Sequence, residues 1–132
     1  MADVRVLVVD DQEPYRRAMA AAVEETSGFV LVGVATSGEE SLELAEELRP
    51  DLVLMDVNLP GIDGIEATRR LTAGAKAPVV VLLSTYDADE VDVYGCGATA
   101  YVAKAAFGAE KLAEVWIAGQ PLPAPPGRAY DA

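Results

Sequence analysis

The side chains most suited to chemistry stand where predicted β-strands end. They comprise three carboxylates, two hydroxyl groups and one ammonium group: Asp10, Asp11, Asp56, Ser84, Thr85 and Lys104. The carboxyl ends of parallel strands form the usual binding crevice of an open α/β sheet, so we expect these groups to converge. Carboxylate oxygens without Cys or His ligands favour a hard cation such as Mg²⁺. A cation and an ammonium together suit an incoming phosphoryl group, for which an aspartate oxygen is a competent nucleophile.

Short apolar runs alternate with helical stretches along the chain. The predicted strands are Val4–Val9, Phe29–Ala35, Leu52–Met55, Val79–Leu83 and Ala100–Ala103. The predicted helices cover about 14–26, 37–49, 63–74, 88–94 and 109–118. Near-continuous apolar strands are typical of a parallel sheet covered on both faces. The pattern predicts a doubly wound α/β domain with a five-stranded parallel sheet.

The second predicted helix has a clear beginning. Ser37 and Glu40 have the spacing of a capping box, and the helix should end before Pro50. Its apolar line is expected at Leu42, Ala45 and Leu48, opposite a mostly glutamate face.

Composition excludes several function classes. The 132-residue chain carries a net charge of -12, which disfavours direct nucleic-acid binding. It has no histidine, so zinc sites with histidine ligands and Ser-His or Cys-His catalysis are excluded. Its one cysteine, Cys96, forms no internal disulfide, and neither a membrane span nor a secretion signal is apparent. We therefore expect a reduced, cytoplasmic setting and no membrane partner.

Each candidate residue taken alone also has a plainer interpretation. An Asp-Asp pair after a strand is commonly a turn or helix cap. Asp56 could mark the exit of its strand into solvent, Ser84 and Thr85 are ordinary strand-end residues, and Lys104 could flank a helix. Their joint occurrence at four strand ends is what predicts a site, and it places Asp56 at the rim of the core.

The sequence resembles a response-regulator receiver domain, the phosphoacceptor half of two-component signalling. The segments that carry the resemblance, over about residues 3–118, are VLVVDDQEPYRR, LVLMDVNLPGIDGIEATRRL, STYD and YVAK. SGFVLVGVATSGEESLELAEELRPDLVLMD and GIEATRRL are similar to the NarL/FixJ-type subgroup. The resemblance implies the flavodoxin-like (βα)5 receiver fold.

The resemblance also implies residue roles. Asp56 would be phosphorylated by a sensor histidine kinase, and Asp11, Asp56 and the carbonyl of Asn58 would bind Mg²⁺, with Asp10 acting mainly through water. Ser84 would hydrogen-bond the phosphoryl group, Lys104 would pair with it, and Tyr101 would be the aromatic switch residue. Such a domain catalyses only its own phosphorylation and dephosphorylation.

Two features depart from the family pattern. Only 20 positions separate Ser84 from Lys104, which shortens the fourth predicted helix, and its YGCG segment is glycine-rich. Residues 120–132 read as a Pro-rich tail or interdomain linker after a receiver domain at 1–119. The subgroup normally carries a DNA-binding domain after such a linker, so the chain is either a receiver from a longer regulator or a stand-alone receiver, and the linker-like tail favours the first. We expect transcription regulation as the output. A homodimer on phosphorylation is a separate expectation.

Two other interpretations stay open on the sequence alone. A phosphatase of the haloacid-dehalogenase type also uses an aspartate nucleophile with Mg²⁺, but it needs an Asp-x-Asp pair where this chain has DDQE. A receiver-fold module could also bind partners without any phosphate. Every position that phosphoryl chemistry requires holds a suitable residue, which argues against a module that works without phosphate.

Overall fold

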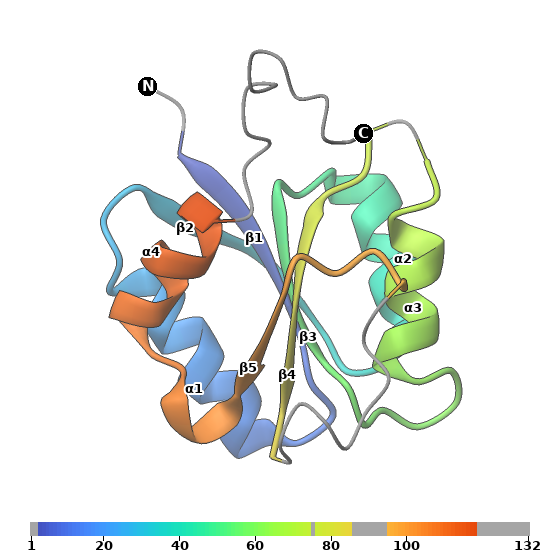
Figure 1. The fold of residues 1–132 in the computed structure, drawn as a ribbon, viewed down its shortest axis with the longest axis horizontal. Helices are drawn as coiled ribbons and strands as arrows, with labels where there is room; N and C mark the ends of the chain where they lie inside the picture. The colour runs from blue at the N-terminus through green and yellow to red at the C-terminus, as the bar shows by residue number, and fades with distance from the viewer. Residues whose placement is uncertain (1–2, 75, 86–94, 119–132) are drawn as a thin grey trace, which may run out of the picture.

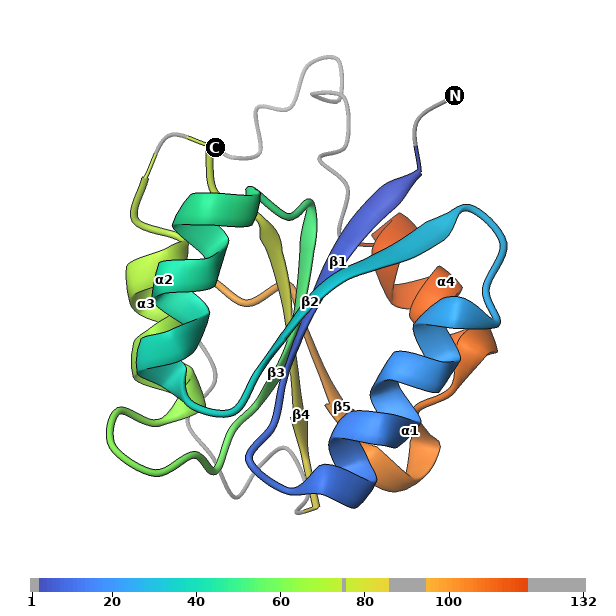
Figure 2. The same ribbon diagram turned by 180° about the vertical axis from the view of Figure 1, so that it is seen from behind.

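The fold is a five-stranded parallel sheet between two pairs of helices (Figures 1 and 2). The computed structural model describes residues 3–74, 76–85 and 95–118. The strands are β1 (Val4–Val9), β2 (Phe29–Ala35), β3 (Leu52–Asp56), β4 (Val79–Ser84) and β5 (Ala100–Ala103), in the spatial order β2-β1-β3-β4-β5. The helices are α1 (Glu13–Glu24), α2 (Gly38–Leu48), α3 (Gly64–Leu71) and α4 (Ala109–Ala118), with a short 3-10 turn at Lys104–Ala106. The predicted doubly wound parallel fold is confirmed.

The sheet separates two hydrophobic clusters. α1 and α4 cover one face and α2 and α3 cover the other (Figure 1). β3 is buried along its whole length, and its residues alternate between the clusters, with Leu52 and Leu54 facing α1 and α4 and Val53 and Met55 facing α2 and α3. A strand buried on both faces needs apolar residues at every position, which explains the unbroken LVLM run.

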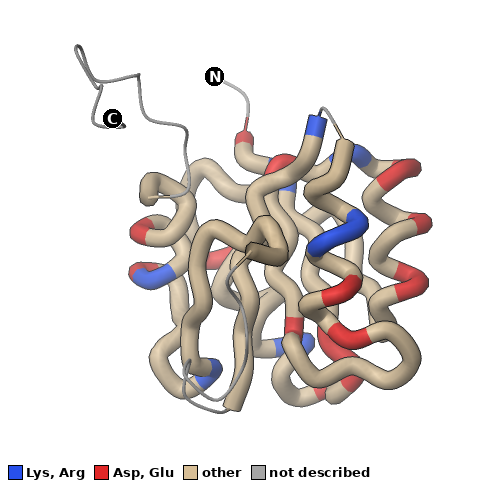
Figure 3. Tube along the Cα trace, turned by 45° about the vertical axis from the view of Figure 1, so that its right-hand side comes forward, with Lys and Arg blue, Asp and Glu red and all other residues tan. Residues whose placement is uncertain are grey.

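The predicted helix α2 is confirmed, but the expected apolar line is partly wrong. Ser41 is fully buried and Leu44 and Ala45 pack on the core, whereas Leu42 lies at the edge of the buried face. Three-residue steps drift around a helix of 3.6 residues per turn, so the true face combines three- and four-residue steps. The acidic residues of α2 therefore point outward, and Figure 3 shows how the charged positions are distributed along the chain.

Helix ends explain most of the small differences from the predicted boundaries. The Ser37 hydroxyl accepts a hydrogen bond from the Glu40 N–H at 3.0 Å, as the capping box predicts. The Glu40 carboxylate accepts a hydrogen bond from the Thr36 N–H at 2.7 Å, one residue before the N–H of the cap residue that donates in the ideal box. α1 spans Glu13–Glu24 rather than 14–26, and the hydroxyl of Thr26 donates to the Ala22 carbonyl at 2.6 Å beyond its end.

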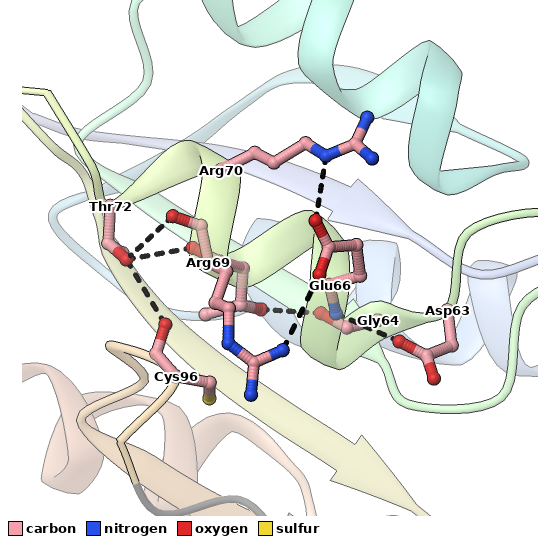
Figure 4. Close-up of polar contacts among 8 residues, drawn as sticks. Asp63, Gly64, Glu66, Arg69, Arg70, Thr72 and Cys96 are labelled. Atoms are coloured by element: carbon pink, nitrogen blue, oxygen red, sulfur yellow. Dashed lines mark hydrogen bonds and ion pairs between the residues drawn. The ribbon is translucent and has the colours of Figure 1, made fainter.

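α3 is held at both ends (Figure 4). Asp63 caps its start by accepting the Glu66 N–H at 2.8 Å. At its other end the Thr72 hydroxyl lies 2.8 Å from the Thr68 carbonyl and 3.2 Å from the carbonyl of Cys96, and its single proton serves one acceptor at a time. Gly97 has a φ of +104°, and a Cβ there would come within 2.1 Å of the Thr72 hydroxyl oxygen. This close approach ties α3 to the segment that leads into β5.

α4 agrees with its predicted span. Leu112 and Val115 are buried, and the Trp116 ring meets Phe29 of β2 edge-on with a centroid distance of 6.4 Å. The helix predicted at about 88–94 and the Pro-rich segment 120–132 lie outside the described residues. Within the part of the chain that the structure describes, no helix combines the length and apolar character needed to cross a bilayer.

Candidate functional site

An ion-pair cluster lies at the carboxyl edge of the sheet. Asp10 follows β1, Asp56 ends β3 and Lys104 follows β5. The Lys104 ammonium lies 2.8 Å from Asp10 Oδ2 and 3.2 Å from Asp56 Oδ1. The Lys104 side chain is only 7% exposed, so this contact is shielded from water and the positive charge offsets the cost of burying two carboxylates. The predicted convergence of these three residues is what the structure shows.

Asp11 completes an acidic cluster beside this ion pair. One carboxylate oxygen from each of Asp10, Asp11 and Asp56 lies within 4.8 Å of the others. Asp11 is exposed, while the other two are buried. Asp10 Oδ2 has no directed hydrogen bond among the described residues; its close neighbour is the Lys104 ammonium. Three oxygen donors around one open point suit a hard divalent cation.

The backbone after β1 holds Asp10 in place. The Gln12 N–H donates to Asp10 Oδ1 at 2.8 Å, and the guanidinium of Arg16 donates to the Asp10 carbonyl oxygen at 3.0 Å. The Asp10 N–H in turn donates to the Ala35 carbonyl at 3.1 Å, which continues the ladder to β2. These three bonds leave Asp10 Oδ2 directed at the cluster.

Asp56 is positioned by the turn that follows it. The Gly64 N–H donates to the Val57 carbonyl at 2.8 Å, bringing the start of α3 against the end of β3. A Cβ at position 64 would lie 2.1 Å from the Asp56 carbonyl oxygen, so only glycine fits. The intervening turn is fixed from α2, because Glu39 accepts the Ile62 N–H at 3.1 Å.

Burial and charge shift the titration of Asp56. Burial, followed by repulsion from Asp10, raises the pKa of Asp56 to about 6, while Lys104 and the backbone of Asn58 oppose the shift. At 3% exposure Asp56 is more buried than the rim position expected from the sequence. The Lys104 ammonium thus offsets the combined effect of burial and of the Asp10 charge only in part.

A pocket of about 280 Å³ opens onto this cluster, lined by Gln12, Tyr15, Asp56, Asn58, Thr85 and Lys104. The Tyr15 ring forms one wall, with Lys104 Nζ 3.8 Å from its centroid. A larger hollow of about 510 Å³ lies among residues such as Pro50, Pro78 and Trp116 at the other end of the sheet. That hollow lacks converging carboxylates, so the chemistry and not the volume selects the smaller pocket.

Ser84 on β4 and Tyr101 on β5 are the predicted switch residues. Ser84 is fully buried at the end of β4, where it pairs in register with Ala103, next to Lys104. Tyr101 is half-buried and packs against the hydrophobic core cluster beneath α2 and α3. It is not among the residues that line the pocket at the acidic cluster. Sequence reasoning missed Gln12, Tyr15 and Gly64.

An acidic cluster with a buried lysine at the carboxyl edge of a five-stranded parallel sheet defines a receiver-type α/β domain. The family model for the response regulator receiver domain matches residues 6–116. The chain therefore belongs to the receiver domains of two-component response regulators.

Curated relatives and solved structures agree with this assignment. The chain is 41% identical over 121 residues to the response regulator GacA of Pseudomonas viridiflava, covering 89% of this chain and 56% of that protein. It is 38% identical to the transcriptional regulatory protein LiaR of Bacillus subtilis, covering 84% of this chain and 52% of LiaR. The chain thus spans about half the length of these relatives. The signal receiver domain of the response regulator NarL from Mycobacterium tuberculosis superposes with a TM-score of 0.83 at 26% identity, covering 90% of this chain and 98% of that domain.

Proposed function

We propose that this domain is a phosphoacceptor switch in which Asp56 takes a phosphoryl group from a sensor histidine kinase. The observation that carries the proposal is the shared contact of Lys104 with Asp10 and Asp56, beside Asp11 and open to a pocket. A buried cation next to a carboxylate at a pocket floor provides a nucleophile and a charge for the oxygens of an incoming phosphoryl group.

The transfer step starts from Asp56 and Lys104, whose side chains lie 3.2 Å apart. A carboxylate oxygen of Asp56 attacks the phosphorus of a phosphohistidine, the P–N bond breaks, and its electron pair stays on the leaving imidazole. Lys104 pairs with a phosphoryl oxygen, and the Ser84 hydroxyl donates to another. Because nucleophile and counter-charge belong to this chain, the domain catalyses its own phosphorylation and dephosphorylation and no other turnover.

The oxygen donors at the edge fit Mg²⁺. Asp11, Asp56 and the carbonyl of Asn58 would hold the ion directly, and Asp10 would hold it through water. Asn58 lines the same pocket as Asp56, and Asp11 is the exposed carboxylate of the cluster. When bound, Mg²⁺ neutralises charge on the phosphoryl oxygens.

The output follows from a change in charge at Asp56. A phosphoryl group adds roughly -1.5 to -2 charge, which draws Ser84 and Lys104 toward it. The half-buried Tyr101 lies three residues before Lys104 on β5 and would move toward the space that Ser84 leaves. Residues 1–119 would form the receiver and 120–132 a linker to a DNA-binding output domain. Transcription regulation is the output we propose, because the relative LiaR is named a transcriptional regulatory protein. A cytoplasmic location and a homodimer that forms on phosphorylation complete the proposal.

Intact mass after incubation with acetyl phosphate tests this function. The wild type should gain one phosphoryl group with Mg²⁺ and none with a chelator. Asp56→Asn should gain none, while Asp51→Asn, at the opposite end of β3, should behave as the wild type. Equal phosphorylation of the wild type and Asp56→Asn would overturn the proposal.

A further inference from the structure

Tyr15 places its ring against the Lys104 ammonium, the cation that also meets Asp10 and Asp56. It lies in the first turn of α1, is 36% exposed, and lines the pocket together with Asp56 and Lys104. Its ring centroid is 3.8 Å from Lys104 Nζ, well within the range of a cation–π interaction. None of the roles assigned so far uses this contact.

The position of the Lys104 ammonium is set by the groups that surround it. A lysine ammonium is a point charge on a flexible four-carbon stem, so its position depends on what surrounds it. Here it meets Asp10 at 2.8 Å, Asp56 at 3.2 Å and the Tyr15 ring face at 3.8 Å. The ammonium therefore has three close neighbours, two carboxylates and one aromatic ring, and the ring is the one that carries no charge.

We propose that Tyr15 is a positioning residue that holds the Lys104 ammonium over Asp56 for phosphoryl transfer, an inference that rests on the proposed phosphoacceptor function. An aromatic face attracts a cation without offering it a proton acceptor, so it confines Lys104 without competing with the phosphoryl oxygens. Tyr15 thus acts through Lys104 and leaves the reacting atoms untouched.

Two substitutions separate the ring face from the rest of the side chain. Tyr15→Phe keeps the face and removes the hydroxyl, whereas Tyr15→Leu keeps apolar bulk and removes the face. A partly shielded cation–π contact corresponds to roughly a 3- to 10-fold change in rate. The control is Arg17→Ala, because Arg17 lies on the exposed side of the same helix and pairs with Glu13 on that helix.

The experiment measures the phosphorylation rate with acetyl phosphate and Mg²⁺, together with the proton chemical shifts of the Lys104 side chain. We expect Tyr15→Leu to be phosphorylated about 3- to 10-fold more slowly than the wild type. The upfield ring-current shift of the Lys104 terminal methylene should disappear in this variant. Tyr15→Phe and Arg17→Ala should keep both the rate and the shift. Tyr15→Met serves as a second ring-free variant if Tyr15→Leu fails to fold.

Three results would overturn the positioning role. They are a Tyr15→Leu rate within 2-fold of the wild type, a Tyr15→Phe rate as low as that of Tyr15→Leu, and a wild type whose Lys104 signals lack a ring-current shift. If the wild type takes up no phosphate at all, the phosphoacceptor function fails. The chemical shifts then still decide whether the ring holds Lys104.

Discussion

The Cα of Gly64 packs directly against the carbonyl of Asp56, closely enough that a methyl group at position 64 would lie 2.1 Å from that oxygen. The same glycine donates its N–H to the Val57 carbonyl at 2.8 Å. The first residue of α3 therefore fixes the backbone of the proposed phosphoacceptor. α3 and the site are thus in contact at position 64, where there is no room for a side chain.

Substitution of this glycine tests the close contact. Gly64→Ala should destabilise the domain by about 1–3 kcal/mol, because the added methyl group forces the start of α3 away from β3. Gly74→Ala is the matched control, since a Cβ there meets nothing within 4 Å, and it should leave stability nearly unchanged. Urea denaturation of both variants measures the difference. Equal stabilities would show that the loop relaxes without cost.

Removal of the buried Lys104 ammonium should reveal how much free energy it costs to bury Asp10 and Asp56 without a counter-charge. Lys104→Met, with a chelator present at pH 8, should lower the free energy of unfolding by about 3 kcal/mol, because Asp10 and Asp56 lose their counter-charge. The loss should shrink at pH 5, where Asp56 takes up a proton. Lys111→Met removes a more exposed ammonium paired with Glu114 and should change stability by well under about 1 kcal/mol. A Lys104→Met protein as stable as the wild type at pH 8 would contradict the role given to the ion pair.

The raised pKa of Asp56 predicts a definite pH dependence without divalent ions. The pKa of Asp56 is about 6 in the folded chain and 3.8 in the unfolded chain, so Asp56 ionises less readily when the chain is folded. The unfolded state therefore loses this proton first, and the folded state loses stability as pH rises through about 4 to 6. The charges that face Asp56 are those of Asp10, Asp11 and Lys104.

Asp56→Asn is the reference for that titration. The stability of the wild type relative to this variant should fall by up to about 3 kcal/mol between pH 4 and pH 7 in a chelator. Denaturant titrations across this range measure the effect. A constant difference between the two proteins would mean that Asp56 titrates normally.

Magnesium should stabilise the folded domain through the acidic cluster. At about 100 times its dissociation constant, an ion that binds only the folded state adds about 2.7 kcal/mol. Thermal unfolding with and without Mg²⁺, at constant ionic strength, should show this gain in the wild type and a much smaller one in Asp11→Asn. Glu47→Gln, on the exposed side of α2, should respond as the wild type does. An unchanged response in Asp11→Asn would remove Asp11 from the metal site.

The convergence of the main site residues could be predicted from the sequence. Asp10, Asp56 and Lys104 each follow or end a short apolar run, and a parallel topology brings such ends to one edge. That inference needs only element order, which local patterns define well. The sequence pattern predicts a rim position for Asp56, whereas the residue is buried. Its exposure depends on how Lys104 and the loop that follows Asp56 fold over it.

Contacts that depend on packing could not be predicted. Nothing in the local pattern around Tyr15 shows that its ring meets Lys104, almost ninety positions away in the chain. Glycine is needed at position 64 because the backbone of Asp56 comes close to it. The surrounding sequence gives no sign of that contact. Three-residue steps predict an apolar line through Leu42, whereas Leu44 is the leucine of α2 that packs against the core cluster.

The most direct test of the central claim locates the phosphoryl group in the chain. Borohydride reduces an aspartyl phosphate to homoserine, so reduction after incubation with acetyl phosphate and Mg²⁺, followed by peptide mapping, marks the acceptor. The account predicts homoserine at position 56 alone, dependent on Mg²⁺ and strongly reduced in Lys104→Met. Homoserine at Asp10 or Asp11 instead, or at no position while mass shows a bound phosphate, would contradict it.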